Sequence, residues 1–162
     1  MATQGNTLLN EGIPAIEDAF VVIVKTEWNA HIVDTLEEGA IKVFKEHGVK
    51  YLTITVPGAF EIPFMIKSIA KHYTDNNISA FIAFATVIQG DTPHFDYVCQ
   101  GITNGIGQLN LELEVPTIFG VLTVLTEEQA IERIGGKHGH KGEEAAVTAI
   151  KMIHLNRKVL ST

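Results

Sequence analysis

Residues 56–63 read Val-Pro-Gly-Ala-Phe-Glu-Ile-Pro, and they join an apolar strand-like run to an apolar run with helical spacing. The two prolines fix the backbone angle φ, and Gly58 allows the backbone to come close to a ligand. Phe60 and Glu61 place an aromatic ring beside a carboxylate, an order that a hydrophobic core would not favour. We therefore interpret this stretch as a binding loop between a strand and a helix.

A second loop of similar build follows the next strand-like run. Residues 87–98 read Val-Ile-Gln-Gly-Asp-Thr-Pro-His-Phe-Asp-Tyr-Val. The amides and the hydroxyl at positions 90–92 suit a phosphate at a helix N-terminus, provided that the Asp91 side chain points away from it. Two such loops in one short chain predict a single shared site.

The order of the apolar runs predicts the fold. Four continuous, β-branched runs are typical of strands covered on both faces: residues 19–25, 52–56, 80–88 and 117–122. Runs with helical spacing lie between and after them: residues 32–48, 62–73, 95–113, 126–134 and 143–160. The Thr-Glu-Glu-Gln sequence at 126–129 is a capping-box pattern. The alternation predicts an α/β fold, a three-layer α/β/α sandwich around a central four-stranded parallel sheet.

The length of 162 residues predicts one domain, which we place at residues 19–162. Residues 1–18 then form an N-terminal arm. This arm is either a free terminus or a strand added to the sheet of a neighbouring copy.

Composition excludes several classes of partner. The net charge of −7 and the scattered Lys and Arg residues argue against nucleic-acid binding. Because no apolar run approaches the ~20 residues of a membrane span, and because residues 1–10 lack the features of a signal peptide, we expect a cytoplasmic protein without a membrane partner. The lone Cys99 lies in an apolar helical run, where we interpret it as a small buried hydrophobe in preference to a nucleophile.

In parallel α/β sheets, ligands bind beyond the carboxyl ends of the strands. Trp28 follows the first strand and either stacks on a flat heterocycle or covers the end of the sheet; Phe60 nearby favours stacking. We expect Asn29 to cap the next helix through its side chain. Glu61 either stabilises a helix start or binds in the site. His94 opens the third helix, where a neutral imidazole is favoured and protons exchange near neutral pH.

A Gly-rich segment follows the fourth strand. It carries Arg133, Lys137 and Lys141, spaced by four residues, which are enough for one small anion. His138 and His140 alternate with glycines, but a metal site would need a third and a fourth ligand and none is evident. The other interpretation of the segment is an exposed flexible loop.

Three motifs in order carry a family resemblance: Pro-Gly-Ala-Phe-Glu-Ile-Pro at 57–63, Thr-Val-Ile-x-Gly-x-Thr-x-His at 86–94, and Glu-Gln-Ala-Ile-Glu-Arg at 128–133 followed by Gly-x-Lys-x-Gly-x-Lys-Gly at 135–142. The chain resembles the lumazine synthase family from about Phe20 to Lys158. The resemblance implies a flavodoxin-like fold and the condensation of 5-amino-6-ribitylaminouracil with 3,4-dihydroxy-2-butanone 4-phosphate, giving 6,7-dimethyl-8-ribityllumazine in riboflavin biosynthesis. It implies no cofactor. It also implies homo-oligomers, which in this family are pentamers and often hollow shells of sixty chains.

The resemblance also implies roles for individual residues. His94 moves protons. The expected substrate-binding residues are Trp28, Ala59, Phe60, Glu61, Thr86, Val87, Ile88, Asp91, Thr92, Phe119, Arg133, Lys137 and Lys141. Among them, Trp28 stacks on the pyrimidine, residues 59–61 hold the ribityl chain, residues 86–88 meet the ring edge mostly through backbone groups, and Asp91 and Thr92 bind phosphate. Phe119 and Arg133 come from the adjacent subunit.

Two positions depart from the family pattern, which often has Phe at the position of Trp28 and Arg at that of Gln89. The first enlarges the stacking platform. The second removes a cation beside the phosphate loop, so we expect Arg133 to carry more of the phosphate attraction.

Two other functions would use the same features: a flavodoxin-like module that binds flavin without turnover, and a shell protein without catalysis. A product assay with both substrates distinguishes them from a synthase. The sequence shows no Ser-His-Asp or Cys-His pattern and no Gly-x-Gly-x-x-Gly after the first strand.

Overall fold

The computed structural model describes residues 12–73 and 77–161. Its centre is a four-stranded parallel sheet in the order β2-β1-β3-β4. The strands are β1 Phe20–Thr26, β2 Lys50–Val56, β3 Ala80–Ile88 and β4 Thr117–Val124. The predicted sheet is confirmed, and its strands differ from the expected ranges by at most two residues at either end.

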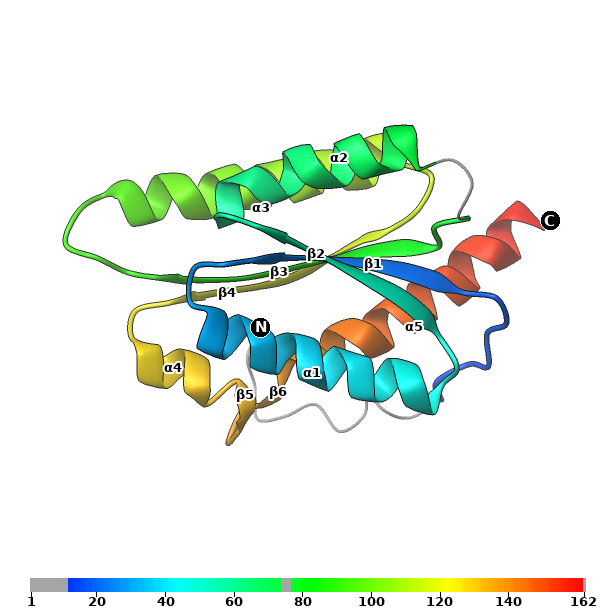
Figure 1. The fold of residues 1–162 in the computed structure, drawn as a ribbon, viewed down its shortest axis with the longest axis horizontal. Helices are drawn as coiled ribbons and strands as arrows, with labels where there is room; N and C mark the ends of the chain where they lie inside the picture. Colours follow the sequence, from blue (N-terminus) through cyan, green and yellow to red (C-terminus); the bar gives the residue numbers. More distant parts are fainter. Residues whose placement is uncertain (1–11, 74–76, 162) are drawn as a thin grey trace.

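Helices cover both faces of the sheet, so the three-layer α/β/α fold is confirmed (Figure 1). One face carries α2 Ile62–His72 and α3 His94–Glu112. The other carries α1 Ala30–Glu46, α4 Glu127–Ile131 and α5 Lys141–Leu160. Successive residues of β1 alternate between these layers: Val21 and Ile23 pack with α1 and α5, whereas Val22 and Val24 pack with α2 and α3. Burial on both faces explains why the strands read as continuous apolar runs.

The segment after α4 differs from expectation. We expected the helix to continue to about Ile134 and the next one to start near Glu143. Instead, a short antiparallel hairpin joins them, with β5 at Ile134–Gly136 and β6 at Gly139–His140. The glycines make this possible, because Gly135 and Gly139 have φ angles of 118° and 77°. Residues 134–140 are thus a short hairpin, of which residues 135–137 are exposed.

The capping-box pattern at the start of α4 is confirmed. Thr126 occupies the N-cap, and its hydroxyl accepts a hydrogen bond of 3.4 Å from the Gln129 amide. In a capping box, the side chain of the third helical residue accepts a hydrogen bond from the backbone N of the cap residue. Here the Gln129 side chain accepts instead from the backbone N of Leu125, at 2.9 Å. The reciprocal pair that defines this motif is thus shifted by one residue.

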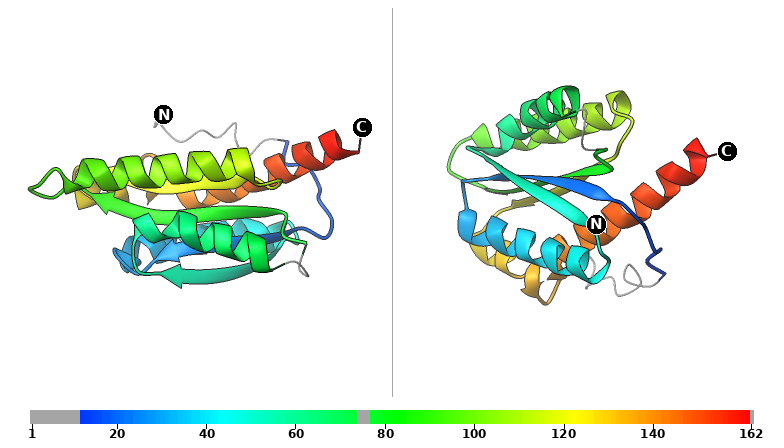
Figure 2. Two further views of the ribbon diagram at one scale, coloured as in Figure 1. Left: turned by 90° about the horizontal axis from the view of Figure 1, so that it is seen from above. Right: turned by 45° about the vertical axis from the view of Figure 1, so that its right-hand side comes forward.

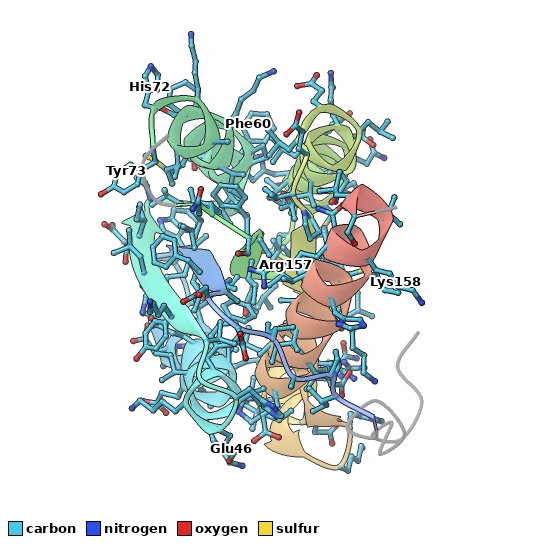
Figure 3. All side chains as sticks on the ribbon, turned by 90° about the vertical axis from the view of Figure 1, so that its right-hand side faces the viewer. Glu46, Phe60, His72, Tyr73, Arg157 and Lys158 are labelled. Atoms are coloured by element: carbon cyan, nitrogen blue, oxygen red, sulfur yellow. The ribbon has the colours of Figure 1, made fainter. Side chains whose placement is uncertain are left out.

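The start of the described chain is fastened to the end of α5. Arg157 donates from Nη1 to the Glu17 carbonyl at 2.6 Å and from Nη2 to the Asp18 carbonyl at 3.2 Å. Figure 3 shows Arg157 directed from α5 towards the start of β1, whereas Lys158 points outwards. Ile13 and Ile16 pack against the core on the same side of the sheet. Of the expected arm at residues 1–18, residues 1–11 lie outside the described residues, and the addition of a strand to a neighbour stays a prediction.

The two ends of the sheet differ in what lies beyond them. At the end where the strands start, the last turns of α5 extend past the sheet (Figure 2). At the end where the strands finish, the β3–α3 connection projects outwards (Figure 1). Within the described part of the chain, no helix has both the length and the apolar character to cross a membrane.

Candidate active site

The carboxyl ends of the strands bring the predicted binding loops together. The loop after β1 is joined to β2 by a 2.9 Å bond from the Glu27 amide to the Val56 carbonyl. The loop after β3 is joined to β4 by a 2.9 Å bond from the Gln89 amide to the Val124 carbonyl. This shared edge is the place where open α/β sheets bind ligands.

Trp28 is presented to solvent at this edge, with 74 % of its surface exposed. Its backbone is held on both sides: the amide donates to the Pro57 carbonyl at 3.4 Å, and the carbonyl accepts from the Thr26 hydroxyl at 3.0 Å. A tryptophan that covered the end of the sheet would be buried. The structure therefore leaves the indole available for stacking on a ligand.

The loop after β2 presents Phe60 and Glu61. The Phe60 ring lies against α3 beside Gly101. A Cβ added to Gly101 would come within 2.4 Å of a carbon of this ring. Phe60 is nevertheless 63 % exposed. Glu61 occupies the N-cap position of α2, but its side chain makes no capping hydrogen bond. Its carboxylate lies over Gly58. The interpretation of Glu61 as a simple cap is thus not supported, and its carboxylate faces the loop.

Asn29 differs from expectation. It stands at the N-cap of α1 but makes no side-chain capping bond, because its backbone is in the left-handed region at φ 57° and ψ 38°. Its side-chain Nδ2 instead donates a 2.7 Å hydrogen bond to the carbonyl of Thr86 in β3. The sequence did not predict this bond, because an Asn directly before a helix is the usual pattern of a side-chain cap.

The loop after β3 leads into α3, and His94 is the first helical residue, as predicted. Gly90, Asp91, Thr92 and His94 are all exposed. Before the loop, Thr86 is almost fully buried, whereas Val87 and Ile88 are partly buried. Residues 86–88 can therefore meet a ligand mainly through backbone groups, and the loop residues can meet it through side chains.

Phe119 lies apart from these loops. It is on β4, an edge strand of the sheet, and pairs with Ala83. Because β4 continues for five more residues to Val124, Phe119 is about 17 Å from the carboxyl edge at about 3.3 Å per residue. It is 43 % exposed although it belongs to a strand that is otherwise mostly buried. An exposed aromatic on an edge strand suits contact with another molecule.

The three cations of the Gly-rich segment do not share a helix face. Arg133 precedes β5, and its carbonyl accepts from the Lys141 amide at 2.8 Å, while Lys137 sits in the turn between β5 and β6. Two of the three ammonium or guanidinium groups are paired with carboxylates: Lys137 with Glu132 at 2.7 Å, and Lys141 with Glu144 at 2.7 Å. Arg133 donates to a neutral acceptor, the Gln129 carbonyl, at 2.6 Å. Of the three, Arg133 keeps its positive charge least compensated within the subunit.

His140 and Cys99 are partly buried side chains outside the three binding loops. His140 packs its ring against Gly39 and its Nδ1 accepts from the Glu143 amide at 3.4 Å; burial lowers the pKa of its imidazole. Among residues 12–73 and 77–161, no group of three or more His, Cys, Asp and Glu side chains is placed to hold a metal ion. Cys99 is only partly buried, and burial followed by the charge of Asp96 raises the pKa of its thiol.

A family model described as 6,7-dimethyl-8-ribityllumazine synthase matches residues 18–157, which include all three binding loops. The chain belongs to this family. A 6,7-dimethyl-8-ribityllumazine synthase from Porphyromonas gingivalis is 49 % identical over 150 residues, covering 91 % of each chain. One from Bacteroides fragilis is 50 % identical over 134 residues, covering 81 % of this chain and 92 % of that protein. One from Cytophaga hutchinsonii is 43 % identical over 144 residues, covering 87 % and 89 %.

The family predicted from the three sequence motifs is therefore confirmed, and so is its activity as a transferase of riboflavin biosynthesis.

Proposed function

We propose that the chain condenses 5-amino-6-ribitylaminouracil with 3,4-dihydroxy-2-butanone 4-phosphate in a site formed between two copies of itself. One observation carries this proposal. The carboxyl edge of the sheet presents an exposed indole and phenyl ring, Trp28 and Phe60, while Phe119 lies about 17 Å from that edge on an exposed sheet margin. A residue so placed reaches such a site only on a neighbouring subunit.

Within one subunit, the loops divide the substrates between them. Trp28 stacks on the pyrimidine, and Ala59, Phe60 and Glu61 hold the ribityl chain, whose hydroxyls suit a carboxylate acceptor. Backbone groups of residues 86–88 fix the edge of the ring. Asp91 and Thr92 take the phosphate end at the start of α3, with Asp91 using its backbone, because its carboxylate would repel the anion. Phe119 and Arg133 of the neighbour close the site, and Lys137 and Lys141 support its positive field.

The chemistry needs no cofactor, because the substrates carry the reactive groups. The amine of the uracil attacks the ketone and forms an imine with loss of water. Elimination then releases inorganic phosphate, and ring closure loses a second water. The protein contributes orientation above all, and His94 transfers protons at the exposed start of α3. Mixing the protein with both substrates should produce the fluorescence of the lumazine product; bound flavin without product would instead indicate a binding module.

Oligomers follow from a shared site. We propose a homopentamer as the smallest active unit, and a closed shell of sixty chains as the larger assembly, because the connection at residues 135–142 is short. We also place the enzyme in the cytoplasm, which agrees with the lack of a membrane-spanning helix in the described part of the chain. Sedimentation measures the size of the assembly, and electron micrographs with isolated pentamers under all conditions would contradict the shell.

Arg133→Ala should mainly weaken the butanone phosphate. Loss of a charge-assisted contact to phosphate costs about 2 kcal/mol, which raises the KM of that substrate about 30-fold. The KM of the uracil should stay within about twofold, because the stacking loop belongs to another element. Steady-state kinetics with each substrate varied in turn measures both. An equal loss for the two substrates would mean that Arg133 maintains the interface instead of binding phosphate.

His94→Ala should lower kcat about tenfold to a hundredfold and leave the binding of the uracil intact. General acid–base groups contribute ~10²–10⁴-fold, but here the nucleophile belongs to a substrate and orientation supplies the larger share. The measurement is single-turnover formation of the lumazine, with sedimentation as the control for assembly. Complete inactivity with normal binding would show that His94 is indispensable, and an unchanged rate would show that it only begins a helix.

A further inference from the structure

The turn that carries Trp28 is tied to three strands. Thr26, at the end of β1, binds the Trp28 carbonyl through its buried hydroxyl at 3.0 Å. The Glu27 and Trp28 amides donate to carbonyls at the end of β2 and just after it. The third tie is the 2.7 Å bond from Asn29 Nδ2 to the Thr86 carbonyl of β3. This bond from the Asn29 side chain joins residues that are 57 positions apart in the sequence.

The backbone of Asn29 indicates what that bond does. At φ 57° and ψ 38°, Asn29 is in the left-handed region, which costs free energy for residues other than glycine. Asparagine is among the side chains that tolerate it best. The left-handed turn reverses the chain directly after Trp28 and sends the Asn29 amide across the end of the sheet. The same residue therefore sets the direction of the turn and its distance from β3.

We propose that Asn29 is a positioning residue that fixes the distance between the Trp28 indole and the β3 backbone at residues 86–88. The Trp28 indole and the backbone of residues 86–88 are the two groups proposed to bind the pyrimidine, so this inference rests on the proposed function of the site. Holding both walls before the substrate arrives removes the entropy cost of ordering them upon binding. Asn29 does not contact the reacting atoms and acts only through Trp28 and Thr86.

Two substitutions separate the contributions of Asn29. Asn29→Gly keeps a backbone that accepts the left-handed turn but removes the amide. Asn29→Asp keeps the shape but replaces the donor with an acceptor that faces the Thr86 carbonyl. We expect the glycine variant to raise the KM of the uracil about threefold to tenfold, as the loss of one hydrogen bond implies, and the aspartate variant to raise it further. The KM of the butanone phosphate should change less than twofold in both, because its loop is anchored on β3 and α3.

Trp28 also reports directly on its own position, because it is the only tryptophan. In the unliganded protein, acrylamide should quench its fluorescence more strongly in both variants than in the wild type. The matched control is Asn156→Asp, which removes the same kind of bond, from Asn156 Nδ2 to the Glu114 carbonyl at 2.9 Å, at a position in α5. This control should change neither the KM of the uracil nor the quenching.

Wild-type quenching and a wild-type KM in Asn29→Gly would overturn the proposal. So would equal losses for both substrates, or the same losses in Asn156→Asp. If the wild type itself made no lumazine, the proposed function would fail, but the quenching of Trp28 would still decide whether Asn29 positions the indole.

Discussion

Mixed assemblies of His94→Ala and Arg133→Ala subunits are expected to show synthase activity well above that of either variant alone. The reason is geometric. His94 belongs to the carboxyl edge of one sheet, whereas in the proposed site Arg133 comes from the neighbour. In an assembly made of both variants, some sites receive His94 from one subunit and Arg133 from the other, and these sites have the full set of residues.

The size of the recovery follows from random mixing. With equal amounts of the two variants, about a quarter of the sites in a cyclic ring combine the two intact residues. The assay is lumazine formation at low butanone phosphate, where both single variants are impaired. The subunits are first dissociated in denaturant and then reassembled together, so that each ring draws its neighbours from both variants. Isolated subunits, identified by sedimentation, should have no activity at all.

A pair on the same side of the interface is the matched control. Trp28→Ala and His94→Ala both alter the loops at the carboxyl edge of a single subunit, where Trp28 and His94 start from neighbouring strands. No site in their mixture combines an intact Trp28 with an intact His94, so reassembly should restore nothing. Recovery in this pair, or an active preparation that is strictly monomeric, would contradict a site shared between subunits.

Much of this site could be predicted because strand order and loop position are encoded locally. Buried parallel strands read as apolar β-branched runs, and the loops at their carboxyl ends are then known to meet. Trp28, Phe60 and His94 were placed at one edge by this argument alone, and the structure puts all three loops there. The capping box before α4 was equally readable, since its partners are three residues apart.

Contacts between distant segments could not be predicted in the same way. The bond from Asn29 to Thr86 depends on a left-handed backbone that the sequence allows but does not require. The hairpin of β5 and β6 was missed because strands of three and two residues have no readable period. The exposure of Phe119 depends on how much of β4 the helix α3 covers. This coverage cannot be predicted from the residues next to Phe119 in the sequence.

The packing of α1 against α5 is another feature invisible in the sequence, and it makes Gly142→Ala the most damaging small substitution that we expect. Gly142 lies in the first turn of α5 and is buried against Leu36 of α1. A Cβ at this position would lie 1.9 Å from the carbonyl oxygen of Leu36 and 2.7 Å from its carbonyl carbon. These are backbone atoms of a helix, so they cannot turn aside as the end of a flexible side chain would, and the two helices must separate.

Overpacked cores lose about 1–3 kcal/mol and occasionally more, and separation of α1 from α5 disturbs a large shared core. We therefore expect Gly142→Ala to lower the free energy of unfolding by about 3 kcal/mol, partly offset by the higher helix propensity of alanine. Gly107→Ala is the control, because Gly107 is also helical, in α3, and a Cβ there would meet nothing within 4 Å. It should raise stability by up to about 1 kcal/mol. Denaturant titration of the two variants measures both changes, and equal stabilities would show that α1 and α5 can separate at no cost.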